Sequence, residues 1–94
     1  MRLSENELAV IRNTLLAVDP KGKIVLFGSR TLDSRKGGDI DIYFETSERL
    51  DLATRLALEY KISALCDNKV DLLIKTPDLP EKTIFAIARE GIPL

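Results

Sequence analysis

The chain has 94 residues, of which 45% are hydrophobic and 31% charged, and its formal net charge is −1. These values are typical of a globular protein and predict a single domain over residues 1–94. The charge gives no basic field for bulk nucleic-acid binding, and no apolar run reaches the roughly 20 residues of a membrane span. With no signal peptide, a cytoplasmic protein is expected. Because there is no histidine and Cys66 is the single cysteine, a Ser-His-Asp triad, an internal disulfide and a Cys/His zinc site are excluded.

The first half of the chain predicts one helix and two strands. Ser4 and Glu7 match a capping box, and the helix that they begin should end before Asp19, which precedes a proline. A strand is expected over residues 23–27. A loop follows over residues 28–38, with one helical turn around residues 31–34. The second strand spans about residues 39–45, and alternation places three apolar side chains on its core face: Ile40, Ile42 and Phe44.

The second half predicts a helix, a strand and a last helix. Thr46 and Ser47 are the expected caps of a helix over residues 48–66, whose apolar stripe consists of Leu52, Leu56, Ile62 and Leu65. A third strand spans residues 69–75. The last helix, over residues 81–89, ends at Gly91 and should turn four apolar side chains inward: Ile84, Phe85, Ile87 and Ala88.

This order of elements predicts an α/β (α+β) fold, α-β-α-β-α-β-α, with a three-stranded mixed sheet in the order 1-2-3. The second and third strands are joined through a full helix, which suits a parallel pair. Asp39, Asp41 and Asp71 would then meet at one edge of the sheet, because each lies near the start of its strand. Gly28 and Ser29 close the first strand at its far end, so they reach this edge only if that strand runs antiparallel.

The chemistry of these residues favours a metal and a phosphate. Asp39 and Asp41 lie on one face of a strand, about 7 Å apart, where like charges repel unless a cation lies between them. Three carboxylates without histidine favour Mg²⁺ or Mn²⁺, which usually completes its shell with water and substrate phosphates. Two such ions can activate an attacking hydroxyl and stabilise the leaving oxygen. Asp39, Asp41 and Asp71 are therefore the candidate catalytic and metal-binding residues.

The loop after the first strand supplies candidate phosphate contacts. Gly28 lets a ligand approach the backbone closely, and Ser29 adds a hydroxyl. Arg30, Arg35 and Lys36 can neutralise the remaining phosphate charge. Taken singly, a Gly-Ser turn or an Asp-x-Asp strand start is usually an ordinary surface feature. The joint pattern predicts transfer of a nucleotidyl group from a nucleoside triphosphate.

Three segments together resemble the nucleotidyltransferase signature of the DNA polymerase β superfamily: Phe27-Gly28-Ser29-Arg30, Asp39-Ile40-Asp41-Ile42 and Val70-Asp71-Leu72-Leu73. More narrowly, nearly the whole chain resembles the minimal nucleotidyltransferases, or MNT proteins. The resemblance implies that Gly28 and Ser29 contact the triphosphate of ATP and that Asp39 and Asp41 bind both metals. It implies that Asp71 completes one metal site and helps activate the acceptor hydroxyl. Many members are antitoxins encoded beside a HEPN-domain ribonuclease toxin, and some silence it by adenylylating a tyrosine.

The sequence departs from the family at two places. Thr31-Leu32-Asp33 stands where many relatives have Ala-Arg-Gly, and the short carboxyl tail shows nothing resembling the acceptor-binding domain of larger relatives. Acceptor recognition is therefore expected to come from a partner or another subunit. The expected function is transfer of AMP from ATP to a protein hydroxyl, on a HEPN-type toxin. Two alternatives stay open: an antitoxin that neutralises its partner by contact alone, and transfer to a small hydroxylated molecule. The sequence also leaves a homo-oligomer open.

Overall fold

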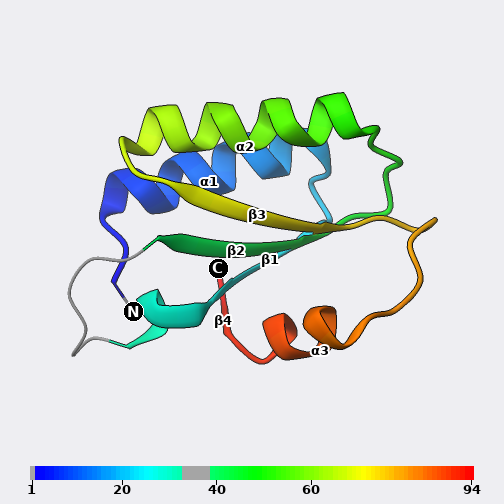
Figure 1. The fold of residues 1–94 in the computed structure, drawn as a ribbon. Coiled ribbons are helices and arrows are strands. Elements are labelled where there is room, and N and C mark those ends of the chain that lie inside the picture. The colour runs from blue at the N-terminus through cyan, green and yellow to red at the C-terminus, as the bar shows by residue number, and fades with distance from the viewer. Residues whose placement is uncertain (1, 33–38) are drawn as a thin grey trace.

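The structure is a computed structural model, and it describes residues 2–32 and 39–94. A four-stranded sheet lies between helices α1 (Glu5–Val18) and α2 (Leu52–Cys66) on one face and helix α3 (Thr83–Arg89) on the other (Figure 1). The strands are β1 (Lys23–Phe27), β2 (Ile40–Glu45), β3 (Val70–Lys75) and β4 (Ile92–Pro93), and a short 3-10 helix, η1 (Gly28–Thr31), follows β1. The predicted class, helices packed on a mixed sheet, is confirmed.

The strand order β3-β2-β1-β4 confirms the predicted neighbours and corrects the predicted count. As predicted, β2 runs parallel to β3 and antiparallel to β1. The three-stranded sheet is wrong, because β4 pairs with the other edge of β1 through Val25 with Pro93 and Leu26 with Ile92. A strand of two residues has no alternation that a sequence could reveal. Gly91 permits this approach, since a Cβ there would lie 2.1 Å from the carbonyl oxygen of Leu26.

The main core lies between the sheet and helices α1 and α2. Ile40, Ile42 and Phe44 of β2 are fully buried there, as alternation along the strand predicts. They pack in one cluster with Ile11 and Leu15 of α1, which lie one helical turn apart on the same side of the helix. This burial fixes the register of β2, so that the residues between the apolar positions face α3.

Helix α2 begins later than predicted. Its N-cap is Asp51, whose carboxylate accepts a hydrogen bond of 2.8 Å from the backbone N–H of Thr54. The predicted caps, Thr46 and Ser47, bind elsewhere. The Thr46 hydroxyl and the Ser47 backbone N–H donate to the same carboxylate oxygen of Asp19, at 2.8 and 3.1 Å. A contact between residues far apart in the chain therefore displaces the helix start.

The apolar stripe predicted for α2 is mostly exposed. Ile62 is fully buried, but Leu52, Leu56 and Leu65 expose 62%, 57% and 53% of their surface. The buried side of the helix is a narrow line completed by Cys66. Helix propensity and spacing predict that a helix forms here, but they do not determine how much of its apolar surface the sheet covers.

Helix α3 covers the second face of the sheet with one side only. Phe85 and Ala88 are buried as predicted and pack in a second cluster with Tyr43. Ile84 and Ile87, which were predicted to face inward, are 43% and 58% exposed. Among the described residues, no helix is both long and apolar enough to cross a membrane.

Candidate nucleotidyl-transfer site

The site lies where β2 and β3 begin. The parallel register of these strands places Asp41 directly beside Asp71, on neighbouring strands about 4.8 Å apart. Both side chains point to the α3 side of the sheet, because Ile40 and Val70 before them are buried against the other face. Asp39 lies just ahead of β2. The prediction that the three aspartates lie at one edge of the sheet is confirmed.

Among the described residues, the negative charges of Asp39, Asp41 and Asp71 are only partly balanced by positive charge. The pKa of Asp41 is raised above its ordinary value by burial first, and then by the negative charges of Asp71 and Asp39. The ammonium of Lys69 opposes this rise. Its Nζ lies 3.8 Å from Oδ2 of Asp39 and 3.7 Å from Oδ1 of Asp71, and all three side chains are about half exposed or more. Within residues 2–32 and 39–94, Lys69 is the cation that lies against these carboxylates.

Lys69 is a site residue that the sequence reasoning did not single out. The signal was present, because Lys69 precedes Asp71 by two positions and side chains two apart in a strand share a face. A lysine two residues before a predicted catalytic aspartate could therefore have been assigned to the same edge. Its role as the counter-charge of two carboxylates needed the tertiary structure.

Gly28 touches the carboxylate edge from β1. The antiparallel pairing of β1 and β2 places Phe27 opposite Asp41, and the chain then turns at Gly28 with φ +75°. A Cβ at this position would lie 2.3 Å from Oδ2 of Asp41, so only glycine fits. The turn continues into η1, where the Thr31 hydroxyl donates to the Gly28 carbonyl at 2.7 Å. The helical turn predicted around residues 31–34 therefore begins earlier, and residues 33–38 lie outside the described residues.

Of the three cationic residues predicted to bind phosphate, the structure describes only Arg30. Arg30 is 9% exposed, and its guanidinium donates to the Arg2 carbonyl at 2.7 Å and lies 3.8 Å from Oε1 of Glu7. It therefore connects η1 to the start of α1. Arg35 and Lys36 lie outside the described residues. The Ser29 backbone belongs to η1, and its side chain also lies outside what the structure describes.

The chemistry of the edge fits a divalent cation, although a complete metal site is not preformed. Over residues 2–32 and 39–94, no three acidic, cysteine or histidine side chains are grouped closely enough to hold a metal ion. Oxygen ligands with negative charge are nevertheless what Mg²⁺ and Mn²⁺ prefer, and Asp71 and Asp39 both add, after burial, to the rise in the pKa of Asp41. The three-carboxylate metal site stays a prediction.

Comparisons with known proteins agree with this geometry. The sequence profile of the family described as "Polymerase beta, Nucleotidyltransferase" matches residues 11–94. A search of curated proteins found no match.

Among solved structures, this chain is similar to a chain in the complex of a tri-AMPylated Shewanella oneidensis HEPN toxin with an MNT antitoxin. The TM-score is 0.56 at 34% identity, covering 73% of this chain and 52% of that chain. It is also similar to two mutant forms of the toxin–antitoxin complex MntA–HpeT. One has a TM-score of 0.73 at 29% identity, with 99% of this chain and 72% of that chain covered. The other has a TM-score of 0.60 at 33% identity, with coverages of 73% and 56%.

This chain spans about half the length of the matched chain from Shewanella oneidensis. The residues that the family profile matches, 11–94, include the features that form the site: the parallel β2–β3 pair with facing aspartates and the glycine turn after β1. Because the family profile covers nearly all of the sequence, the chain belongs to the polymerase β nucleotidyltransferase family.

Proposed function

We propose that this chain is the catalytic domain of a metal-dependent nucleotidyltransferase that transfers AMP from ATP to a hydroxyl of a HEPN-domain toxin, and so acts as its antitoxin. The observation that carries the proposal is the facing pair of Asp41 and Asp71, packed against a turn that only glycine can make, in a member of this family. The Shewanella oneidensis complex, which contains a tri-AMPylated HEPN toxin, supports both the nucleotide and the acceptor.

In this proposal Asp39, Asp41 and Asp71 hold Mg²⁺ or Mn²⁺. The bound cation would supply charge neutralisation at the phosphates and activation of the acceptor oxygen. Asp71, about half exposed, is the carboxylate that we assign to meet an acceptor hydroxyl arriving from solvent and to take up its proton, as the family resemblance implies. The pKa of Asp41 is raised by burial first and then by the charges of Asp71 and Asp39, so a bound cation would favour its charged form.

The triphosphate is proposed to lie over the turn at Gly28, where the missing side chain lets an oxygen approach the backbone. Ser29, Arg35 and Lys36 remain the proposed side-chain contacts to the phosphates. Arg30 is left out of this set because its guanidinium is engaged with the start of α1. We keep the cytoplasm as the proposed location, since the donor ATP is an intracellular metabolite.

The test is AMP transfer to a purified HEPN-domain protein. Incubation with ATP and Mg²⁺ should increase the mass of that protein by one or more AMP units, and a chelator should abolish the increase. Asp41→Asn should lose transfer but remain folded. The matched control is Asp67→Asn, an exposed C-cap residue at φ 51°, a conformation that asparagine also adopts readily. This control should transfer AMP normally. Protection from toxicity by Asp41→Asn without any added mass would instead establish neutralisation by contact.

A further inference from the structure

The outer side of β3, where the strand has no neighbouring strand, is a second feature of the sheet and is separate from the carboxylate site. The carbonyl of Lys69 accepts a hydrogen bond from the N–H of Ile40 in β2, and that of Lys75 accepts one from the N–H of Thr46, just after β2. Backbone groups alternate in direction along a strand, so the N–H and C=O groups of Val70, Leu72 and Ile74 point to the opposite side, away from the sheet. Since β3 is the outermost strand, these three residues form the free edge.

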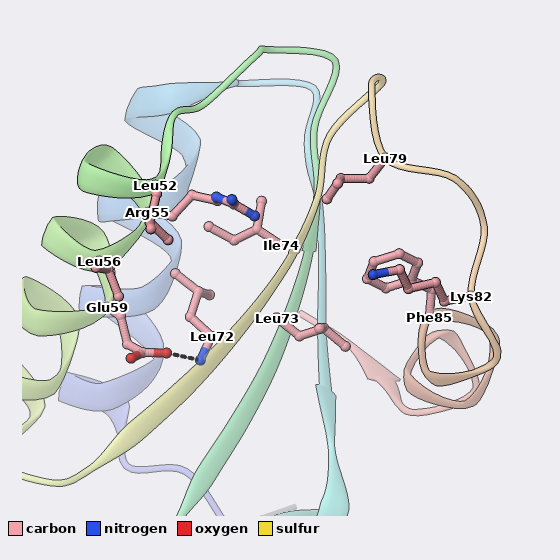
Figure 2. A pocket seen from close by; sticks show the side chains of 10 residues that line it. All are labelled: Leu52, Arg55, Leu56, Glu59, Leu72, Leu73, Ile74, Leu79, Lys82 and Phe85. Carbon is pink, nitrogen blue, oxygen red and sulfur yellow. Dashed lines mark hydrogen bonds between the residues drawn. The ribbon is translucent and has the colours of Figure 1, made fainter.

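Helix α2 covers the first two positions of this edge with polar side chains. The Ser63 hydroxyl accepts from the Val70 N–H at 3.0 Å, and Glu59 accepts from the Leu72 N–H at 2.8 Å, the hydrogen bond drawn in Figure 2. The spacing matches because four residues of helix rise about 6 Å and two residues of strand about 6.6 Å. Every second residue of β3 therefore lies opposite every fourth residue of α2, on one side of the helix.

The series ends at Arg55, which follows Ser63 and Glu59 at the same interval and reaches toward Ile74 (Figure 2). Arginine carries only donors, so it cannot accept from the Ile74 N–H as Glu59 does from Leu72. In addition, the Nε of Arg55 is buried without a hydrogen-bond partner. A backbone donor and a side-chain donor thus face the same space. Buried donors are normally paired, so this space is suited to an acceptor from outside the chain.

Apolar side chains line both sides of that space. Leu52 and Leu56 of α2 form one wall, and Leu79 and Phe85 form the other, with the strand edge between them (Figure 2). Both leucines of α2 expose more than half their surface. The groove has a volume of about 400 Å³, at the low end for ligand sites, and Lys82 adds a second positive charge to its lining.

We propose that this groove receives a short extended segment of the protein acceptor. Its backbone carbonyl or an acidic side chain accepts from Ile74 and Arg55, and an apolar side chain fills the space between Leu56 and Phe85. A strand edge recognises the main chain of an extended peptide, and flanking pockets select its side chains. The donors of Ile74 and Arg55, with the Glu59 carboxylate already bonded to Leu72, favour an acceptor-rich segment, while the charge of Arg55 also interacts with Asp51 and Asp78.

A second copy of this chain fits the groove poorly. Pairing two β3 edges would bring Arg55 and Lys82 of both copies together, which is unfavourable for like charges. The edge also remains available only around Ile74, because Ser63 and Glu59 occupy the positions before it. A flexible segment needs only this short stretch, whereas two rigid sheets would need a longer one.

The groove lies on the same strand as the candidate site. Ile74 follows Asp71 by three residues, or about 10 Å along the strand. Because Ser63 and Glu59 cover the β3 edge before Ile74, the segment would leave the edge there and pass over the α3 side of the sheet, the side on which Asp71 lies, to present a hydroxyl. This assignment rests on the proposed function, since it gives the groove the protein that accepts AMP.

The test compares Leu56→Asp in the groove with Leu65→Asp outside it. Both are leucines of α2 with similar exposure, 57% and 53%, but Leu65 lies toward α1, where its carbonyl accepts from Asn6. Two quantities are measured with the HEPN-domain protein: its affinity without ATP, by calorimetry, and kcat and KM for AMP transfer. We expect Leu56→Asp, and likewise Leu79→Asp from the other wall, to raise the dissociation constant and KM at least tenfold. Affinity for ATP with Mg²⁺ should not change, and Leu65→Asp should behave as wild type.

The outcomes separate the two proposals. If wild type binds the toxin through the groove, with the expected loss in Leu56→Asp, but transfers no AMP, the docking site stands and the proposed function fails. If wild type transfers AMP and both groove variants keep its KM and affinity, the docking proposal is overturned. It is equally overturned if Leu56→Asp abolishes self-association or small-molecule binding and leaves toxin binding intact. If wild type neither binds the toxin nor modifies it, both proposals fall.

Discussion

Replacing Asp41 by asparagine should leave the metal-free protein as stable as wild type or stabilise it by about 0–1 kcal/mol. In the folded state Asp41 lies beside Asp71 at the strand spacing, and two unit charges about 4–5 Å apart repel by roughly 1 kcal/mol in a water-like dielectric. Lys69 offsets part of this repulsion, as a half-exposed ion pair worth about 0–1 kcal/mol. Asparagine keeps the shape and removes the charge, so the repulsion disappears and no buried hydrogen bond is lost.

The effect should depend on pH in a defined direction. Because the folded-state pKa of Asp41 is raised above 3.8, the folded state binds its proton more tightly than the unfolded state. Wild-type stability therefore falls as pH rises from about 3.8 through the folded-state pKa. The asparagine side chain of the variant does not titrate, so the advantage of the variant should be absent near pH 3 and complete at pH 7.

Urea unfolding of both proteins at pH 3 and pH 7 in a chelator measures this difference. Asp19→Asn is the control of opposite sign, because hydrogen bonds from Thr46 and Ser47 lower the pKa of Asp19. It should destabilise at pH 7, and the loss should diminish as pH falls through the lowered pKa. A loss of more than about 1 kcal/mol in Asp41→Asn at pH 7 would mean that Asp41 is a structural acceptor, and would refute the reasoning.

Three further changes have expected outcomes. Gly28→Ala should cost about 1–2 kcal/mol for the positive φ alone, and more for the contact with Asp41, measured as the free energy of unfolding; an unchanged value would mean that the turn can relax. Tyr43→Phe should cost about 1 kcal/mol at pH 7 because the buried hydroxyl donates to Glu45. Since burial raises the pKa of Tyr43 to about 12, wild type should lose stability between pH 10 and 12 and the variant should not; parallel curves would contradict this. Lys69→Ala should raise the pKa of Asp41 further, as followed by NMR titration, because Lys69 supplies the positive charge that lowers it. An unchanged pKa would mean that Lys69 does not act on Asp41 and would contradict its role as the counter-charge.

Features set by near neighbours in the chain could be predicted from the sequence. The capping box of Ser4 and Glu7 forms as predicted, since both hydrogen bonds lie within one helical turn. The limits of β1 are those of its apolar run before Gly28. Alternation along β2 and β3 likewise sets the shared face of the site aspartates, and the helical crossover between the strands indicates their parallel pairing.

Features set by distant partners could not be predicted. Asp19 binds the residues expected to cap α2, so the helix begins later, at Asp51. Strand β4 exists because β1 has an open edge that its own sequence does not reveal. Arg30 belongs to a loop that suggests phosphate binding, but in the folded protein its charge lies against Glu7 of α1.

The candidate site likewise has some features that could be predicted from the sequence and others that depend on distant partners. The sequence by itself determined which carboxylates share a face and where glycine is needed, because a strand fixes side-chain direction residue by residue. Only the tertiary structure decided that Lys69 balances those carboxylates and that α2 leaves the β3 edge open at Ile74. Both depend on the distance and register between separate elements, which are set by packing across the sheet and have no local pattern in the chain.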